Sequence, residues 1–296
     1  MSANPFLLSS GEHRYQRWRE SKLDLYPETA DKLLVGIKGR NLSADEYQAI
    51  TGQCAKSNLA IYQLADPGQG DKAFVRNLGQ KLGLSHLDSN LCADHDSITS
   101  LQVMDAGRHA GYIPYTNRRL SWHTDGYYNK PGEQIRGFLM HCVQPAAAGG
   151  ESLVLDHEIA YLQMRDENPN YIKAFMRESA MTIPPNIENG VEIRAEQTGP
   201  VFSVDAADHL HMRYSARTHN IEWYDDDLTR EAVSYLNSLL NINNPYVFSY
   251  RLGAGEGIIC NNILHCRTSF EDDEQNRRLL YRARYFDRVN NTLIAT

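Results

Sequence analysis

Polar and hydrophobic residues alternate over many short stretches of this chain, and stretches with helical spacing are fewer. Alternation over four to eight residues, bounded by Gly, Pro, Asn or Asp, is typical of strands that bury one face. A Gly-rich turn at residues 253–257 separates two of these stretches. The pattern therefore predicts a mainly β protein, with strands over Leu59–Leu64, Leu101–Met104, Gln134–Val143, Leu153–Leu155, Val201–Val204, Leu210–Tyr214, Tyr246–Leu252, Gly257–Ile263 and Leu279–Phe286.

A few segments have the spacing or the capping residues of helices. The first helix is predicted over Ser43–Ala55, because Ser43 followed by Glu46 three residues on is a capping-box pattern. A second helix is predicted over Lys72–Leu82, and a third begins near Asp156, which can cap it. The fourth, Asp227–Leu240, places its apolar residues on one stripe. That stripe consists of Leu228, Ala232, Leu236, Leu239 and Leu240.

The order of these elements predicts the architecture. Many short strands with long excursions between them favour a double-stranded β-helix (jelly roll) core that carries helical insertions. No internal repeat and no Pro/Gly linker divides the chain. We therefore expect one domain over residues 1–296, with an N-terminal helical segment over about residues 1–95, and a barrel whose mouth can hold a metal between facing strands.

Composition restricts the partners. The chain has 296 residues, a hydrophobic fraction of 42% and a net charge of −7. Because nucleic-acid-binding proteins carry basic faces, we expect a small-molecule substrate and no nucleic-acid partner. No apolar stretch is long enough to span a membrane. The odd number of cysteines and the absence of Cys-x-x-Cys predict no disulfide framework and a cytoplasmic protein. Whether the chain forms a homo-oligomer is open. The cysteines are Cys54, Cys92, Cys142, Cys260 and Cys266.

Three residues form a candidate metal site. His123 and Asp125 are two positions apart, so on a strand both side chains point to the same face. His265 must come from a distant strand. Two imidazoles and one carboxylate are the facial set of non-heme Fe(II) oxygenases. Such a set leaves three metal positions open for a bidentate cosubstrate and for O2.

Other histidines offer weaker alternatives. A second His-x-Asp motif, at residues 86–88, follows a predicted helix and reads as a cap or turn. His209 and His211 alternate on a predicted strand, as a cupin-type ligand pair with another metal would. Their more ordinary interpretation is a half-exposed strand face. Changing His123 and His211 separately would decide between the two sites.

Basic and hydroxyl residues near this triad favour a 2-oxo acid as cosubstrate. Arg278 follows His265 by a dozen or so residues, at the start of the last predicted strand. A period of two places Arg278, Arg282 and Arg284 on one strand face, which suits an anion. Ser152 follows a Gly-Gly turn, where its hydroxyl could bond a carboxylate. Whether Arg278 or Arg282 holds the cosubstrate stays open.

Five short motifs carry a resemblance to a known family. Together they resemble the TauD/TfdA family of Fe(II)/2-oxoglutarate oxygenases, and most of all its γ-butyrobetaine and trimethyllysine hydroxylase branch. The similarity covers roughly residues 45 to 287. The motifs are Tyr115-Thr116, Leu120–Asp125, Leu139–Cys142, Gly149–Leu153 and Leu264–Phe270.

The resemblance implies a function and assigns roles. It makes His123, Asp125 and His265 the iron ligands, pairs Arg278 with the C5 carboxylate of 2-oxoglutarate, and lets Ser152 hydrogen-bond the same carboxylate. The implied reaction is hydroxylation of a C–H bond of a small polar metabolite, with Fe(II), 2-oxoglutarate and O2, giving succinate and CO2. C–N or C–S cleavage is an equal outcome. A non-catalytic metal-binding sensor on the same barrel is the competing class.

The chain departs from the γ-butyrobetaine branch around the substrate. Tyr115 matches one wall of the branch's aromatic cage, but Arg284 stands where another cage tyrosine is expected. We therefore expect an anionic or polar substrate, and a trimethylammonium head alone to be insufficient for binding. If the strand slipped by one residue, Tyr285 would restore the cage. The sequence leaves substrate identity open. The candidate substrate-binding residues are Tyr115, Tyr127, Tyr214, Arg217, Arg282 and Arg284.

Overall fold

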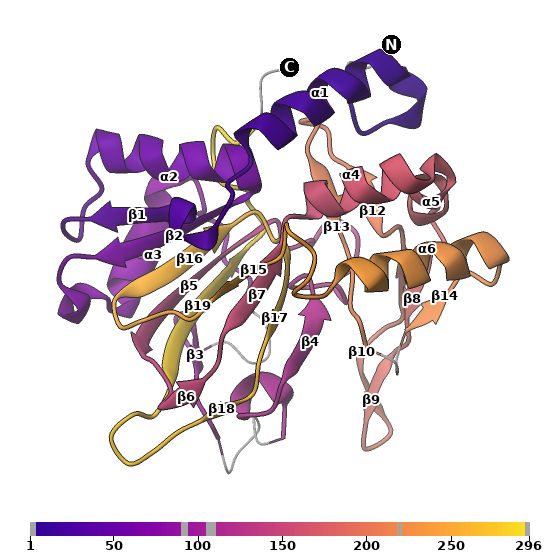
Figure 1. The fold of residues 1–296 in the computed structure, drawn as a ribbon. Coiled ribbons are helices and arrows are strands. Elements are labelled where there is room, and N and C mark those ends of the chain that lie inside the picture. The colour runs from indigo at the N-terminus through magenta and orange to yellow at the C-terminus, as the bar shows by residue number, and fades with distance from the viewer. Residues whose placement is uncertain (1–3, 90–93, 105–110, 218, 220, 294–296) are drawn as a thin grey trace.

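The protein is mostly β with several helices, as a computed structural model shows (Figure 1). The structure describes residues 4–89, 94–104, 111–217, 219 and 221–293. A six-stranded sheet has the order β1 (Leu34–Ile37), β2 (Leu59–Leu64), β16 (Glu256–Cys260), β5 (Gly137–Gln144), β19 (Leu279–Tyr285) and β3 (Thr99–Leu101). A four-stranded sheet has the order β15 (Phe248–Tyr250), β7 (Ser152–Leu155), β17 (Leu264–Arg267) and β4 (Leu120–His123).

The six-stranded sheet is buried on both faces, and successive side chains of its strands belong to two different hydrophobic clusters. On β2, Ile61 belongs to a hydrophobic cluster shared with β7 and β15 of the second sheet, whereas Tyr62 belongs to a cluster shared with α2 (Ala44–Ser57) and α3 (Lys72–Lys81). Successive side chains of a strand point to opposite faces. One face of the large sheet therefore packs on these helices and the other faces the four-stranded sheet.

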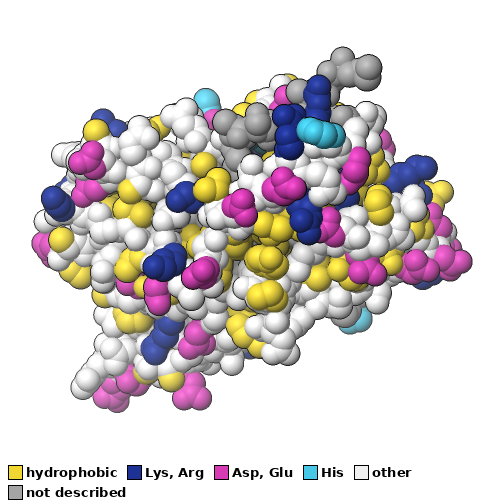
Figure 2. Space-filling view, turned by 45° about the horizontal axis from the view of Figure 1, so that its top comes forward, with side chains coloured by type: hydrophobic (Ala, Val, Ile, Leu, Met, Phe, Trp, Pro, Cys, Tyr) yellow, Lys and Arg dark blue, Asp and Glu magenta, His cyan; other side chains and the backbone are white. Residues whose placement is uncertain are grey.

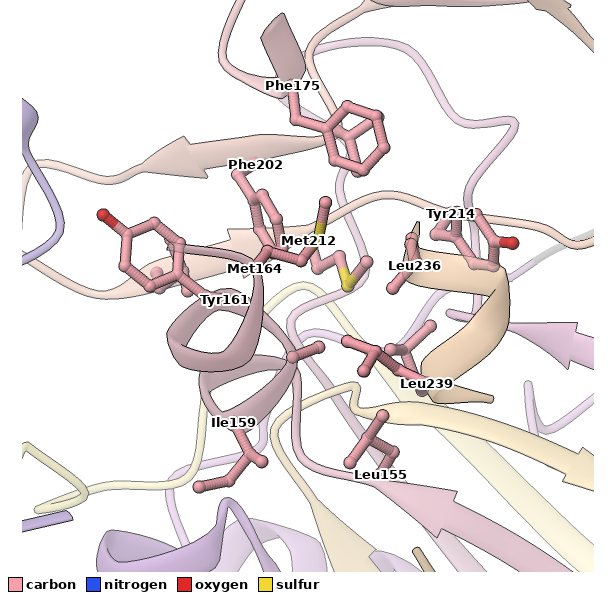
Figure 3. Close-up of a cluster of buried hydrophobic side chains, with 14 of the residues drawn as sticks. Leu155, Ile159, Tyr161, Met164, Phe175, Phe202, Met212, Tyr214, Leu236 and Leu239 are labelled. Carbon is pink, nitrogen blue, oxygen red and sulfur yellow. The ribbon is translucent and has the colours of Figure 1, made fainter. Parts of the chain in front are cut away.

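A second layer of helices lies beside the small sheet (Figure 1). It contains α4 (His157–Glu167), α5 (Pro169–Phe175) and α6 (Asp227–Leu239). Their apolar faces meet in the cluster drawn in Figure 3, where Met164 and Leu236 lie near Phe202 and Met212. The chain between α5 and α6 forms short strands in small sheets of their own: β8 (Met181–Ile183), β9 (Asn186–Glu188), β10 (Val191–Arg194), β11 (Gln197–Gly199), β12 (Phe202–Val204), β13 (Leu210–Met212) and β14 (Glu222–Trp223).

The N-terminal helix α1 (Glu12–Leu25) is attached through a buried charge. Lys22 is 0% exposed, and its Nζ lies 2.6 Å from a carboxylate oxygen of Asp156 and 2.6 Å from one of Glu158. Asp156 also caps α4 by accepting from the Glu158 amide. Breaking a buried pair of this kind by removing one partner costs about 3–5 kcal/mol. The remaining short elements are η1 (Leu8–Ser10), η2 (Ala30–Leu33), η3 (Pro67–Gln69), η4 (Ile113–Tyr115), β6 (Ala148–Gly149) and β18 (Phe270–Glu271).

The structure confirms most predicted elements and shifts some of their ends. The capping box of α2 is present, with Ser43 and Glu46 bonding each other's backbone amides. The strand predicted over Leu101–Met104 is instead Thr99–Leu101. The strand predicted over Gly257–Ile263 ends at Cys260, because the chain there leaves the large sheet for the small one. Helices α1 and α5 and the β9–β10 hairpin were not predicted from the pattern.

The surface charges are mixed, and the described cysteines form no disulfide. On the face in Figure 2, basic and acidic side chains are interspersed. Cys54, Cys142, Cys260 and Cys266 are free and buried, and Cys92 lies outside the described residues. Within the described ranges, no helix has the length and apolarity needed to cross a membrane.

Candidate metal centre

The two histidines of the predicted triad lie side by side on adjacent strands. His123 is the last residue of β4 and pairs in register with His265 on β17. Their ring centroids are 4.3 Å apart. The ring of Phe138, on β5 of the large sheet, lies 4.8 Å from the His265 ring. The pair of imidazoles therefore lies between the two sheets.

Asp125 reaches the histidines from a turn rather than from the strand that the sequence predicted. β4 ends at His123, so the i, i+2 rule for strands does not position Asp125. Instead the Asn262 side chain fixes its backbone: Oδ1 accepts from the Asp125 amide at 2.8 Å, and Nδ2 donates to the Asp125 carbonyl at 2.9 Å. Asn262 has a left-handed φ of 51°, in the break between β16 and β17. No motif in the sequence indicates a role for Asn262.

The geometry leaves one ligand atom free on each member of the triad. The Nδ1 atoms of His123 and His265 lie 2.8 and 3.0 Å from the carbonyls of Ser121 and Ile263. A carbonyl can only accept, so each Nδ1 carries the proton and each Nε2 keeps its lone pair. The three ligand atoms lie within 4.8 Å of one another. Among the described residues, this is the group of His, Cys, Asp and Glu side chains with metal-binding geometry.

Burial and charge hold the triad in the protonation states that a metal requires. Burial lowers the pKa of His123 to about 3, and the neighbouring His265 adds to this, while Asp125 acts against it. Burial also lowers the pKa of His265. Burial alone would raise the pKa of Asp125, but the charges of Arg282 and Arg284, together with His265 and His123, lower the pKa below its usual value. At neutral pH the set is thus two neutral imidazoles and one carboxylate.

These donors fit an Fe(II) ion. Asp125 is 4% exposed, and its Oδ2 is buried without a hydrogen-bond partner in the described structure. A buried carboxylate oxygen without a partner costs free energy unless a ligand satisfies it. With the two free Nε2 atoms, it completes the two-His, one-carboxylate set of non-heme iron proteins.

Two arginines of β19 face the Asp125 carboxylate. Arg282 Nη1 lies 3.3 Å from Asp125 Oδ1, and Arg284 Nη1 lies 3.9 Å from the same atom. Arg284 also donates to the Tyr128 hydroxyl at 2.9 Å and forms an ion pair with Asp88. Asp88 belongs to the second His-x-Asp motif, so the structure gives it a role beyond the predicted cap or turn.

The register of β19 decides between Arg284 and Tyr285. Arg284 points toward Asp125, whereas Tyr285 is 1% exposed and packs with the α3 side of the large sheet. The one-residue slip that would bring Tyr285 into the site is therefore absent. The positive charge of Arg284 is not free, however, because Asp88 and Asp125 both lie against it.

Arg278 and Ser152 line one small cavity, as their predicted shared role requires. Its other lining residues include Cys142, Gly150 and Arg251. Arg278 is 6% exposed, and no carboxylate in the described part of the chain forms an ion pair with its guanidinium. Burial lowers its pKa to about 10. A buried cation of this kind is a site for an anion.

The predicted substrate residues are divided between the site and the core. Tyr127 lies near the triad, with its ring centroid 6.5 Å from that of His123. Tyr214 is 1% exposed and lies in the hydrophobic cluster of Figure 3, and its hydroxyl donates to Asn237 of α6. Tyr115 is likewise buried, in the hydrophobic cluster between the sheets. Arg217 is exposed.

Comparisons with known proteins agree with this geometry. The family described as "Taurine catabolism dioxygenase TauD, TfdA family" matches residues 66–284. A uridine-5'-phosphate dioxygenase of Amycolatopsis sp is 26% identical over 252 residues, covering 81% of this chain and 89% of that protein. One of Streptomyces sp is 30% identical over 205 residues, covering 65% and 71%.

A solved structure shows the same fold at low identity. Asparagine oxygenase, in complex with Fe(II), 3-hydroxyasparagine and succinate, superimposes with a TM-score of 0.58 at 12% identity and covers 91% of both chains. The family match extends over most of this chain and includes His123, Asp125 and His265. The chain therefore belongs to the TauD/TfdA family of Fe(II)- and 2-oxoglutarate-dependent dioxygenases.

Proposed function

We propose that the protein hydroxylates a C–H bond of a small polar metabolite, with 2-oxoglutarate as cosubstrate and with succinate and CO2 as products. The convergence of His123, Asp125 and His265 carries this proposal, because their ligand atoms lie within 4.8 Å of one another. Fe(II) bound there supplies O2 activation coupled to oxidative decarboxylation of 2-oxoglutarate. A hydroxyl placed next to a heteroatom would collapse, so C–N or C–S cleavage is an alternative product outcome.

The chain's own residues bind and orient the cosubstrate in this proposal. Arg278 holds the far carboxylate of 2-oxoglutarate, and Ser152 donates a hydrogen bond to the same group. The support is their shared cavity and the buried guanidinium without a carboxylate partner in the described chain. A guanidinium binds a carboxylate through two parallel hydrogen bonds, so Lys would be a poor substitute.

We further propose that the two facing sheets form a double-stranded β-helix core within a single domain over residues 1–296. The order of strands in the two sheets and the cluster between them support this core. The segment over about residues 1–95 contributes α1, α2 and α3 to the outside. The buried free thiols of the described chain support a cytoplasmic protein.

The substrate proposal is an anionic metabolite, and a nucleoside 5'-phosphate is the first candidate. The two sequence relatives named above are uridine-5'-phosphate dioxygenases. The resemblance to the γ-butyrobetaine branch stays a prediction. The expected repulsion of a trimethylammonium group by Arg284 is weaker than for a free guanidinium, since Asp88 and Asp125 offset its charge.

Substrate-stimulated succinate release tests the proposal. The purified protein is incubated with Fe(II), 2-oxoglutarate, O2 and a panel of nucleotides, amino acids, sulfonates, short carboxylates and betaines. We expect the strongest stimulation from an anionic compound. Stimulation by γ-butyrobetaine or trimethyllysine alone would return the protein to the carnitine-type branch. No succinate with any compound, and no uncoupled turnover, would favour the metal-binding sensor.

A further inference from the structure

Three arginines outside the triad gather around a pair of tyrosines. The tyrosine pair is Tyr127 and Tyr128, whose ring centroids are 5.1 Å apart. The Arg194 guanidinium carbon lies 5.9 Å from the Tyr128 ring centroid. Arg213 Nε donates to the Tyr127 carbonyl at 2.7 Å. Burial raises the pKa of Tyr127, and the nearby charges of Arg217 and Arg194 act against that rise.

The charges of these arginines are not neutralised within the described chain. Arg213 bonds only backbone carbonyls, including those of Met181 at 2.9 Å and Gln197 at 2.6 Å. Arg194 likewise bonds carbonyls, and the described structure contains no ion pair to Arg194, Arg213 or Arg217. Carbonyls satisfy donors but leave the positive charge in place. Burial, and then repulsion from Arg194, lowers the pKa of Arg213 to about 10.

The three arginines differ in how many donors they can offer to a ligand. Most donors of Arg213 are fixed on carbonyls, so it contributes mainly a positive field. Each Arg194 Nη atom bonds one carbonyl, at 3.1 and 2.8 Å, which leaves further N–H groups. Arg217 is exposed, and its guanidinium forms no hydrogen bond with another residue of the described ranges. Arg194 and Arg217 therefore have donors available for an anion.

The tyrosine pair connects these arginines to the metal ligands. The Tyr127 ring lies 6.5 Å from the His123 ring, and the ring of its neighbour Tyr128 lies 5.9 Å from the Arg194 guanidinium carbon. An anion bound beside the tyrosine pair is therefore separated from the triad by an aromatic ring. A small metabolite can thus place its anionic end on the arginines and a C–H bond near the metal.

We propose that Arg194 and Arg217 bind a phosphate group of the substrate beside the tyrosine pair. This inference rests on the proposed function and specifies the substrate class as a phosphate monoester. Phosphate is favoured over a single carboxylate because it presents a double charge and several acceptor oxygens to guanidiniums from two segments. The β9–β10 hairpin, which ends at Arg194, then determines specificity.

Anaerobic calorimetry on the protein loaded with Fe(II) and 2-oxoglutarate tests this site. The probes are two matched pairs: uridine 5'-phosphate with uridine, and ribose 5-phosphate with ribose. We expect the wild type to bind the phosphorylated member of a pair at least about tenfold more tightly, as hydrogen bonds to charged groups predict. R194Q and R217Q should each remove most of that preference and leave uridine affinity within about twofold.

The controls separate this proposal from the proposed function. R230Q removes an exposed arginine that pairs with Asp225 and Asp227 on α6, and should leave all probe affinities unchanged. Because Arg217 is exposed, R217Q keeps the test valid even if R194Q disturbs the hairpin. Equal affinity for both members of each pair, or unchanged preference in both variants, overturns the phosphate site. Normal 2-oxoglutarate binding in the same experiment would leave the oxygenase function standing.

Discussion

Replacing Arg278 with Ala should weaken 2-oxoglutarate binding steeply and leave Fe(II) affinity unchanged. Arg278 is 6% exposed and shares its cavity with Ser152. Removing one partner of a buried charge pair costs about 2–5 kcal/mol. Burial lowers the pKa of Arg278 to about 10, because the buried guanidinium has lost part of its hydration. Removing Arg278 therefore also removes this desolvation cost from the ligand-free enzyme. We therefore expect the lower half of that range, roughly 30- to 300-fold in dissociation constant.

Two further variants and one control make the assay specific. S152A removes a single hydroxyl donor and should cost about 0.5–1.5 kcal/mol. R277A is the matched control, because Arg277 is the exposed neighbour of Arg278. The measurement is an anaerobic titration of 2-oxoglutarate into the Fe(II) protein, followed by the metal-to-ligand absorption band. A larger effect of R282A than of R278A, or an equal effect of R277A, would refute the assignment.

Two other predictions concern the fold and the surroundings of the triad. K22M should lower the free energy of unfolding by about 3–5 kcal/mol at pH 7, because it removes the buried ammonium that lies 2.6 Å from both Asp156 and Glu158. Burial alone would raise the pKa of Glu158, but the charges of Lys22, His157 and Arg288 together lower it, so this contribution is present above a pH of about 4.3 and is lost as the pH falls further. Denaturant unfolding at several pH values should show the K22M deficit shrinking on acidification, and a constant deficit would contradict this. D88N should weaken Fe(II) binding by about tenfold, because Arg284 then competes more strongly for Asp125; unchanged metal affinity would argue against that positioning role.

The sequence predicted the donor set but not the way in which it is held. His123, Asp125 and His265 follow from residue type and spacing, and alternation gave β2 its observed bounds. The Asn262 amide bonds the Asp125 backbone from a distant part of the chain, so no local pattern indicates it. The contact between Asn262 and Asp125 depends on tertiary packing and cannot be read from sequence periodicity.

Helix α1 and Tyr214 illustrate the same limit. The helix is rich in charged residues, and it is attached by the buried charge of Lys22, which a hydrophobic pattern counts as a surface residue. The sequence offers Tyr214 as a candidate substrate-binding residue, but an aromatic ring suits a binding pocket and a hydrophobic core equally well. Its hydrogen bond to Asn237 on α6 places it in the core.

Fe(II) titration of the triad variants shows whether His123, Asp125 and His265 bind the metal. Under anaerobic conditions, H123A, D125A and H265A are compared with the wild type, and H211A is the control from the competing histidine pair. We expect each triad variant to lose Fe(II) binding and the 2-oxoglutarate absorption band, while H211A keeps both. Full iron affinity in any triad variant, or its loss in H211A alone, would contradict the assignment of His123, Asp125 and His265 as the metal ligands.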